Sequence, residues 1–528
     1  MEEADIVVVG GGSGGAAAAG RLSEDGRHTV ALLEAGGRNT GLITRVPGFM
    51  GKQTPKTNWA YETVPQAGLN GRRGYQPRGK GLGGSSAINA MLYVRGAAWD
   101  YDNWAALGCD GWSYADVLPV FKRAEANERG TSEFHGADGP LRVSDQVCPH
   151  PGSVEFVEAG ASLQIPRNDD FNGPGQEGVG LYQVTQHNGE RWTAARGYVE
   201  PARGRANFSI VTDATAERVL FEDGKVWGVA YTRGREQKVI RAKKVVLAGG
   251  VFGTPQLLML SGIGPAAHLA EHGVKPLVDR AQVGANLQDH IDYVSAFEVP
   301  GRYFLGQSFA GNLAMMGQLI RWLRKREGTL TSPFAEAGGF LTLMPGSPAP
   351  DVQFHFVPIV LEDHGRTAVK AHGFSCHVCV LRPESHGTVR LASADVRDAP
   401  LIDPAFLSDD RDMAVMKAGV RAMYRILASP PLNRHGAKDR YPIDLDDDDA
   451  LDRLIRARAD TVYHPVGTAR MGNDADAVCD PQLRVRGVEG LYVADASIMP
   501  TLVSGNTNAP SIMIGERCAD FVKADLFA

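Results

Sequence analysis

The sequence lacks the features that mark secreted, membrane-spanning and nucleic-acid-binding proteins. Only six cysteines occur among 528 residues, too few for a disulfide framework, which is typical of a reducing, cytoplasmic compartment. The first residues, MEEAD, include no basic region of the kind that begins a signal peptide. No apolar run approaches the ~18 residues that cross a bilayer. A peripheral association with a membrane stays open.

Long blocks of lysine or arginine are also missing. Charges of both signs are mixed along the chain and the formal net charge is −6, so we expect no nucleic-acid partner. With 43% hydrophobic and 22% charged residues, the composition is that of a folded globular protein. Glycine is abundant, at 63 residues. That excess indicates turns and close backbone approaches.

The first forty residues have the pattern of a dinucleotide-binding turn. The β-branched run 6–9 leads directly into Gly10, Gly12 and Gly15, which match G-x-G-x-x-G, and an alanine-rich helix follows. The helix N-terminus would bind the pyrophosphate. A second apolar run ends at Glu34, which is placed to accept hydrogen bonds from an adenosine ribose. This acid disfavours NADP but does not separate NAD from FAD.

A second glycine-rich segment covers residues 78–89 (RGKGLGGSSAIN), and four more motifs follow it. They are 253–264 (GTPQLLMLSGIG), 283–290 (VGANLQDH), 463–472 (YHPVGTARMG) and 493–500 (VADASIMP), the last continuing into 504–508 (SGNTN) and 515–517 (GER). Together with the N-terminal turn, these motifs resemble the glucose–methanol–choline (GMC) family of flavoprotein oxidoreductases. The resemblance keeps the family's order from residue 6 to about 521 and so covers nearly the whole chain.

The resemblance implies an α/β fold of two domains. A Rossmann-like FAD-binding domain would comprise residues 1–295 and 483–528, with an inserted substrate-side segment near 156–195. A substrate domain, 296–482, would hold a mainly antiparallel sheet with flanking helices. The runs 245–250 and 491–495 read as buried strands that would join the sheet founded by residues 6–9.

Shorter patterns predict individual elements of these domains. Strands are expected at 353–357 and 375–381, and helices at 318–326, 411–427, 450–459 and 510–520. The acidic run 446–449 reads as a solvated loop rather than a metal site. Cys376 and Cys379 form a C-x-x-C within a strand-like run, where they would point to opposite faces and lack a second ligand pair, so we expect no metal there.

His464 and Asn506 occupy the positions that the family uses for catalysis. The resemblance implies that His464 takes the hydroxyl proton of an alcohol while a hydride passes to flavin N5, a role that suits a neutral imidazole near pH 7. Asn506 cannot act as a base, but it can hydrogen-bond the substrate oxygen and hold it in place. We therefore expect an FAD-dependent alcohol dehydrogenase or oxidase that forms an aldehyde or ketone.

The resemblance also carries the cofactor contacts over to this chain. The expected FAD-binding residues are Gly10, Gly12, Ser13, Gly14, Gly15, Glu34, Ala35, Gly81, Gly84, Ser85, Asn89, Ala90, Met91, Leu92, Ala216, Asp495, Ala496, Asn506 and Thr507.

Two departures from the choline-oxidising members bear on the chemistry. Ile88 stands where some of them carry a histidine that binds the flavin covalently, so we expect noncovalent FAD. The segment 296–330 shows no acidic and tryptophan cluster of the kind that cages a quaternary ammonium, which argues against choline. The stretch 170–198 resembles the sorbose- and alcohol-dehydrogenase branch instead.

Two alternatives stay open on the sequence alone. The electron acceptor could be oxygen or a quinone- or dye-type molecule, because no motif records which. The same fold also supports hydroxynitrile lyases, which keep FAD without net redox chemistry, and His464 does not separate the two reactions.

Overall fold

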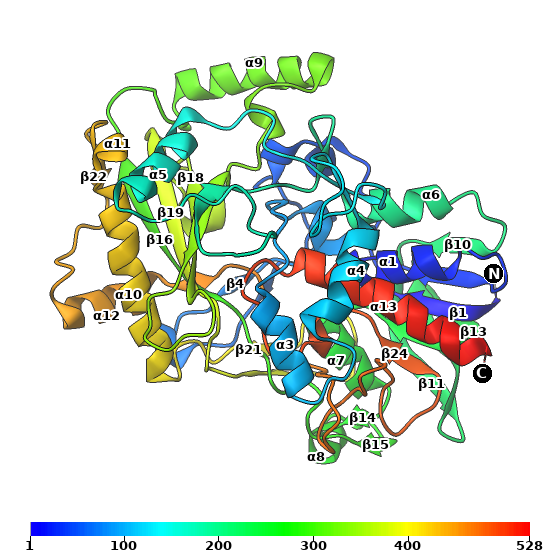
Figure 1. Ribbon diagram of the computed structural model, residues 1–528. Helices are drawn as coiled ribbons and strands as arrows, with labels where there is room; N and C mark the ends of the chain where they lie inside the picture. The colour runs from blue at the N-terminus through cyan, green and yellow to red at the C-terminus, as the bar shows by residue number, and fades with distance from the viewer. Residues whose placement is uncertain (1, 528) are drawn as a thin grey trace.

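The computed structural model describes residues 2–527 and contains two large sheets (Figure 1). The first sheet has the strand order β10-β2-β1-β13-β12-β11, and β24 also pairs with β13. Its strands are β1 (Glu3–Val9), β2 (Val30–Leu33), β10 (Phe208–Val211), β11 (Ala214–Glu222), β12 (Lys225–Arg233), β13 (Glu236–Leu247) and β24 (Leu491–Val493). The runs expected to join the sheet of residues 6–9 do so, through parallel pairing of β13 with both β1 and β24.

Helices cover the central parallel strands of this sheet, whose residues are buried on both faces. Helix α1 (Ser13–Leu22) follows β1 and packs along α13 (Asn508–Phe527), the two lying side by side in Figure 1. Their contact needs glycine, because a Cβ on Gly515 would meet the carbonyl oxygen of Gly14 at 2.2 Å. α13 is longer at both ends than the helix predicted at 510–520. Helix α7 (Gly250–Leu260) follows β13.

The second sheet is antiparallel throughout, with the order β22-β16-β19-β18-β17-β7 and β23 paired to β16. Its strands are β7 (Gly178–Leu181), β16 (Ile291–Glu298), β17 (Ala337–Leu341), β18 (Val352–Val357), β19 (Gly373–Val380), β22 (Lys438–Asp439) and β23 (Asp460–Thr461). Helices α5 (Pro151–Ser162) and α10 (Asp410–Leu427) pack against it. The predicted fold class is confirmed.

Alternation along the central strands gives the second sheet two different faces. Phe354 and Phe356 of β18 join the apolar core under α5 and α10, whereas His355 between them lines a large cavity. On β19, Cys376 joins that same core and Cys379 lies in a separate apolar cluster. The two cysteines thus lie on opposite faces, as the sequence predicts.

Two more helices begin at least two residues before their predicted start. Helix α9 (Phe309–Lys325) begins nine residues before the predicted 318–326, because the Ser308 hydroxyl caps it by accepting the Gly311 N–H at 3.1 Å. The run 446–449 is not simply a loop. Asp447 caps α12 (Asp448–Arg458) by accepting the Ala450 N–H at 2.9 Å, and the following acids occupy the first helical turn, where the helix dipole favours them.

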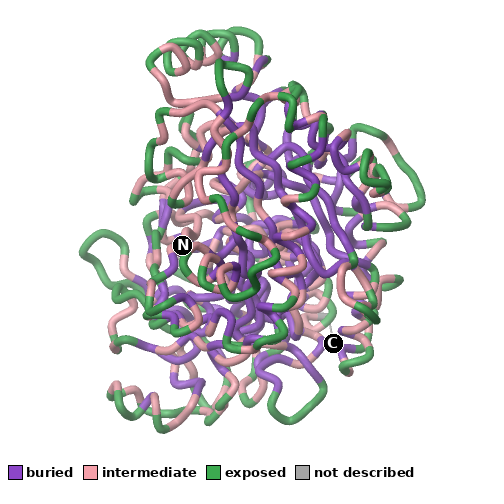
Figure 2. The backbone as a smooth tube through the Cα atoms, turned by 90° about the vertical axis from the view of Figure 1, so that its left-hand side faces the viewer, coloured by how far each residue is buried: buried purple, intermediate pink, exposed green. Residues whose placement is uncertain are grey.

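The domain division stays a prediction, and two strands bear on it. β16 spans the boundary placed at residue 295, and β7, from the segment 156–195, is an edge strand of the second sheet. Buried backbone runs through the interior in Figure 2, with exposed segments at the periphery. Within residues 2–527, no helix is both long and apolar enough for a membrane span.

Smaller elements complete the described chain. The remaining helices are α2 (Leu42–Arg45), α3 (Ala98–Ala106), α4 (Tyr114–Ala124), α6 (Glu200–Ala202), α8 (Ala266–Glu271) and α11 (Pro430–Asn433). The remaining paired strands are β3 (Tyr61–Glu62), β4 (Tyr75–Gln76), β5 (Glu125–Asn127), β6 (Leu141–Val143), β8 (Gln186–His187), β9 (Glu190–Arg191), β14 (Ile263–Gly264), β15 (Val278–Asp279), β20 (Thr388–Arg390) and β21 (Leu401–Asp403).

Candidate active site

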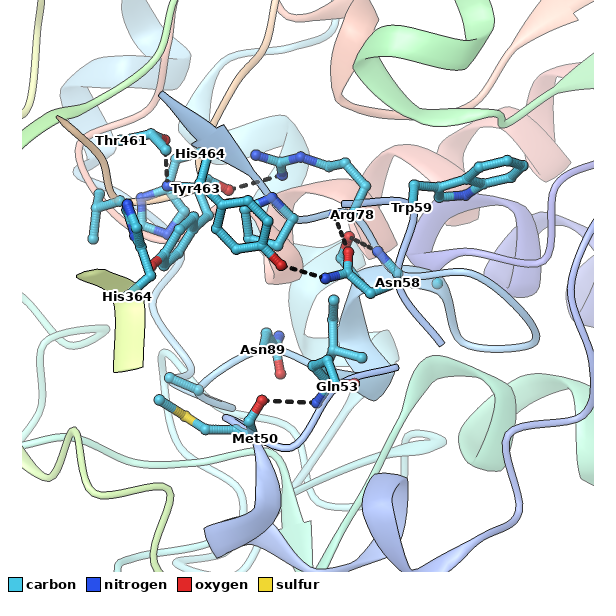
Figure 3. A pocket seen from close by; sticks show the side chains of 18 of the residues that line it. Met50, Gln53, Asn58, Trp59, Arg78, Asn89, His364, Thr461, Tyr463 and His464 are labelled. Atoms are coloured by element: carbon cyan, nitrogen blue, oxygen red, sulfur yellow. Dashed lines mark hydrogen bonds between the residues drawn. The ribbon is translucent and has the colours of Figure 1, made fainter. Parts of the chain in front are cut away.

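A cavity of about 1000 Å³ is lined by residues of both sheets and by the two glycine-rich segments (Figure 3). Every site residue predicted from the sequence lines it, except Gly15 and Gly81. Gly15 packs α1 against the preceding turn, since a Cβ there would meet the Gly10 carbonyl oxygen at 1.9 Å. Gly81 instead donates its N–H to the Glu34 carboxylate at 2.9 Å. Gly15 and Gly81 thus support the cavity wall without lining the cavity.

One end of the cavity is built for phosphate. Gly10 has a φ of +103°, and a Cβ on it would meet the Ala248 carbonyl oxygen at 2.2 Å, so only glycine fits this turn. α1 begins after Gly12, which supplies no side-chain cap, and Gly12, Ser13 and Gly14 all line the cavity. Backbone N–H groups at such a helix start are a ready site for an anion.

The second glycine-rich segment approaches this turn so closely that a Cβ on Gly84 would lie 2.7 Å from the Gly12 Cα. The two turns together form a backbone cradle. Beside it, the Glu34 carboxylate accepts N–H groups from Gly11 at 2.8 Å, Gly36 at 2.8 Å and Gly81 at 2.9 Å. A carboxylate offers about four acceptor positions, so one is left for a hydroxyl. The cradle and this free position fit an adenine dinucleotide.

The other end of the cavity holds His464, on the loop that follows β23. Its backbone N–H donates to Asp289 at 2.9 Å. Its Nδ1 lies 3.0 Å from Nδ1 of His290, and its Nε2 lies 3.0 Å from Nδ2 of Asn506. Asn506 in turn accepts a hydrogen bond from Gln353 at 3.2 Å. The predicted pair therefore meets in one cavity, within a longer chain of hydrogen bonds.

These hydrogen bonds determine which nitrogen of His464 carries the proton. His290 Nε2 lies 3.0 Å from the Leu381 carbonyl oxygen, which can only accept, so His290 carries its proton on Nε2. Its Nδ1 is then an acceptor, and His464 must donate from Nδ1. The Asn506 amide N–H points to the remaining lone pair. Nε2 of His464 is thus unprotonated and available as a base.

Burial keeps these imidazoles neutral. Loss of solvation lowers the pKa of His464 well below its ordinary 6.5, and His290, His355 and Arg78 nearby act in the same direction. Burial likewise lowers the pKa of His290 to about 3. Burial raises the pKa of Asp289 to about 6, while Arg78 pulls it down, so this carboxylate is ionised at neutral pH and faces the His464 backbone.

Each acidic residue that lines the cavity already has at least one partner. Asp292 accepts from His377 at 2.7 Å, and Asp460 from His364 at 3.1 Å. Glu362 meets Arg440 and Arg458 at 3.3 Å each, Asp363 meets Arg366 at 2.6 Å, and Asp495 accepts from Gly250, Thr254 and Ser497. With Glu34, these are the acids among the described lining residues. Each thus has at least one partner, and Oδ1 of Asp292 is a buried oxygen among them without a hydrogen bond.

Apolar side chains make up another part of the wall. Met91 and Leu92, just after the second glycine-rich segment, belong to a buried cluster that also includes Val357 of β18. Phe334 and Ile359 pack against that cluster and line the cavity too. This part of the cavity favours an uncharged, apolar group.

Sequence reasoning missed several site residues. His290 and Asp289 lie inside a recognised motif, but only their position before β16, which pairs with β23, brings them to His464. Gln353 and His355 belong to an ordinary strand pattern, with no local signal for a cavity.

Away from the cavity, His268, Glu271 and His272 lie close enough to hold a metal ion. The expectation of no metal site stays a prediction.

Comparisons with known proteins show what the chain resembles. Residues 4–292 and 383–515 match two family profiles, both described as GMC oxidoreductase. The chain is 45% identical to an alcohol dehydrogenase [acceptor] of Pseudomonas putida (98% of this chain, 95% of the relative). It is 41% identical to the mitochondrial choline dehydrogenase of Homo sapiens (99% and 90%). Among solved structures, it resembles a pyridoxine 4-oxidase from Mesorbium loti, with 31% identity, a TM-score of 0.88 and coverage of 98% and 99%.

Proposed function

The chain belongs to the GMC oxidoreductase family, and on that basis we propose that it oxidises an uncharged alcohol to an aldehyde or ketone with His464 as the general base. One observation carries the proposal. A neutral imidazole, with its proton fixed on Nδ1, points its lone pair toward the Asn506 amide in the same cavity as a dinucleotide cradle.

Members of this family bind FAD, and the residues present here fit it. The turns at Gly10–Gly14 and around Gly84 would hold the pyrophosphate, and Glu34 would accept a ribose hydroxyl. Bound FAD would supply the hydride acceptor. We propose that it is held noncovalently, since Ile88, which lines the cavity, has no atom that could form the link.

The chain's own residues supply the proton chemistry. A substrate hydroxyl that enters between His464 and Asn506 would donate to Nε2 and accept from the amide N–H, in place of their direct 3.0 Å contact. Proton transfer makes His464 a cation in a buried site. His290 continues to accept its Nδ1–H, and the ionised Asp289 against its backbone offsets the new charge.

The paired acids argue for a neutral substrate. A quaternary ammonium is favoured by an anionic partner, and the carboxylates among the described lining residues already pair with arginine, histidine, a hydroxyl or backbone N–H groups, apart from Oδ1 of Asp292. An apolar alcohol instead matches the wall near Met91 and Phe334. We propose oxygen or a quinone-type acceptor as the oxidant. The lyase alternative has no support in the named relatives, which are dehydrogenases and an oxidase.

The test is an anaerobic titration of the FAD-loaded enzyme with a series of straight-chain primary alcohols and with choline. Bleaching of the flavin absorbance by the alcohols, with little or none by choline, is expected. Parallel turnover with oxygen and with a quinone analogue identifies the acceptor. A flavin that no alcohol bleaches, in an enzyme that cleaves cyanohydrins, would refute the proposal in favour of the lyase.

A further inference from the structure

Helix α9 (Phe309–Lys325) lies on the outside of the molecule, at the top of Figure 1, with only one residue, Trp322, buried along its length. Five large apolar side chains face away from the protein. Their exposed fractions are 88% for Phe309, 61% for Leu313, 64% for Met316, 53% for Ile320 and 47% for Leu323. In Figure 2 the same coil, again at the top, is coloured mostly exposed and intermediate.

The spacing of these residues makes them one continuous stripe. Steps of four and three residues keep successive side chains on the same side of a helix. The opposite side of α9 is the anchored one. Trp322 donates its indole N–H to the Gly189 carbonyl oxygen at 2.8 Å, and Met315 and Leu319 pack against the cluster of Val46, Trp322 and Leu330. An outward apolar stripe on a firmly anchored helix is unusual for a surface exposed only to water.

Basic residues gather at the C-terminal end of this helix. Between Glu298 and Glu327 the sequence has no acidic residue, whereas the whole chain carries a net charge of −6. Arg321 pairs with Glu327 at 3.2 Å, and Arg326 with Glu190 at 2.8 Å. The exposed Arg324 and Lys325 form no ion pair with any residue of the described chain. Two free cations thus lie at the C-terminal end of the helix that carries the apolar stripe.

We propose that the outer face of α9 docks on a lipid bilayer that carries anionic headgroups. Apolar side chains on one face with lysine and arginine beside them are the features of helices that lie in the interface of such a membrane. A second copy of the chain fits less well. Two α9 helices would bring together surfaces whose free charges are positive, with no acid on either helix to pair with them.

Docking through α9 would place lipid next to the cavity. Gly311, Asn312 and Met315 of the same helix line the cavity wall. A helix is only about 10 Å thick, so the bilayer surface would lie one helix diameter from this wall. An apolar alcohol or a lipid-soluble acceptor could then exchange between membrane and cavity. This last consequence rests on the proposed function, whereas the docking itself does not.

The test is co-sedimentation of the FAD-loaded enzyme with vesicles. One set is pure phosphatidylcholine and the other is three parts phosphatidylcholine to one part phosphatidylglycerol. The wild-type protein should sediment with the anionic vesicles and be released by high salt. The double variant Leu313→Glu with Ile320→Glu should lower the partition coefficient at least about 100-fold, since two apolar side chains leave the lipid. Arg324→Gln with Lys325→Gln should lower it roughly 10-fold on anionic vesicles.

A matched control changes exposed leucines elsewhere. Leu107, just after α3, and Leu277, just before β15, are 51% and 46% exposed. In Figure 1, α3 lies in the lower half of the molecule and β15 near its bottom, both away from α9 at the top. Leu107→Glu with Leu277→Glu should bind vesicles like the wild type. Light scattering without lipid tests the alternative that the outer face of α9 binds a second copy of the chain. A wild-type dimer that the α9 variant converts to a monomer, or a wild type that stays in the supernatant with anionic vesicles, would overturn the proposal.

Discussion

Replacing His290 with phenylalanine should slow alcohol oxidation while FAD stays bound. His290 is buried and lies 3.0 Å from Nδ1 of His464, on the side away from Asn506. It touches the proposed base, His464, and would not touch the substrate, and its acceptor nitrogen keeps the His464 proton on Nδ1. Phenylalanine fills similar space but offers no acceptor.

The size of the effect follows from that lost contact. A buried N–H without a partner costs about 1–3 kcal/mol. His464 escapes this cost by moving its proton to Nε2, the atom that must receive the substrate proton. The population of the tautomer with an unprotonated Nε2 would then fall by about 5- to 150-fold, since 1.4 kcal/mol corresponds to tenfold. The rate of proton abstraction should fall by the same factor.

Anaerobic stopped-flow measures this rate as the bleaching of flavin absorbance at saturating alcohol, with FAD content taken from the oxidised spectrum. His290→Asn is the matched control, because its side-chain oxygen lies near the former Nδ1 and can still accept. It should recover to within about fivefold of the wild type. The reasoning fails if the phenylalanine variant, fully loaded with FAD, reacts at the wild-type rate. It fails equally if the asparagine variant is as slow as the phenylalanine variant.

Four further predictions address the same cavity. In stopped-flow, His464→Ala should slow flavin reduction by about 10²–10⁴-fold with FAD content unchanged. Asn506→Ala should slow it by roughly 10–100-fold. A near-wild-type rate for His464→Ala would place the base elsewhere. Because burial lowers the pKa of His464, the base stays neutral to more acidic pH, so the acid limb of kcat/KM should lie below pH 6.5, and a limb above it would contradict the assignment. Glu34→Ala should weaken FAD binding at least about tenfold in a fluorescence titration. An unchanged affinity would show that the carboxylate only holds its three backbone N–H partners in place. Acid precipitation should release FAD into the supernatant, and flavin kept in the pellet would show a covalent link despite Ile88.

Much of the cofactor site could be predicted from the sequence because its parts are local. The turn at Gly10–Gly14 and the acid at Glu34 come from one strand–helix–strand unit, in which glycine spacing alone sets the backbone path. The strands 245–250 and 491–495 could be placed for a similar reason, since fully apolar runs bounded by glycine or an acid fit only the centre of a parallel sheet.

The sequence by itself thus determined the family pattern, the dinucleotide turn and the identity of His464 and Asn506. Tertiary structure decided which groups surround these two residues. His290 and His464 are separated by 174 residues and meet because β16 pairs with β23, a contact that no local propensity encodes. Tertiary structure also decided that the apolar stripe of α9 is exposed. Its apolar spacing would suit a buried helix equally well, and only the packing of the whole chain leaves that stripe uncovered, because burial depends on what lies opposite a face and not on the face alone.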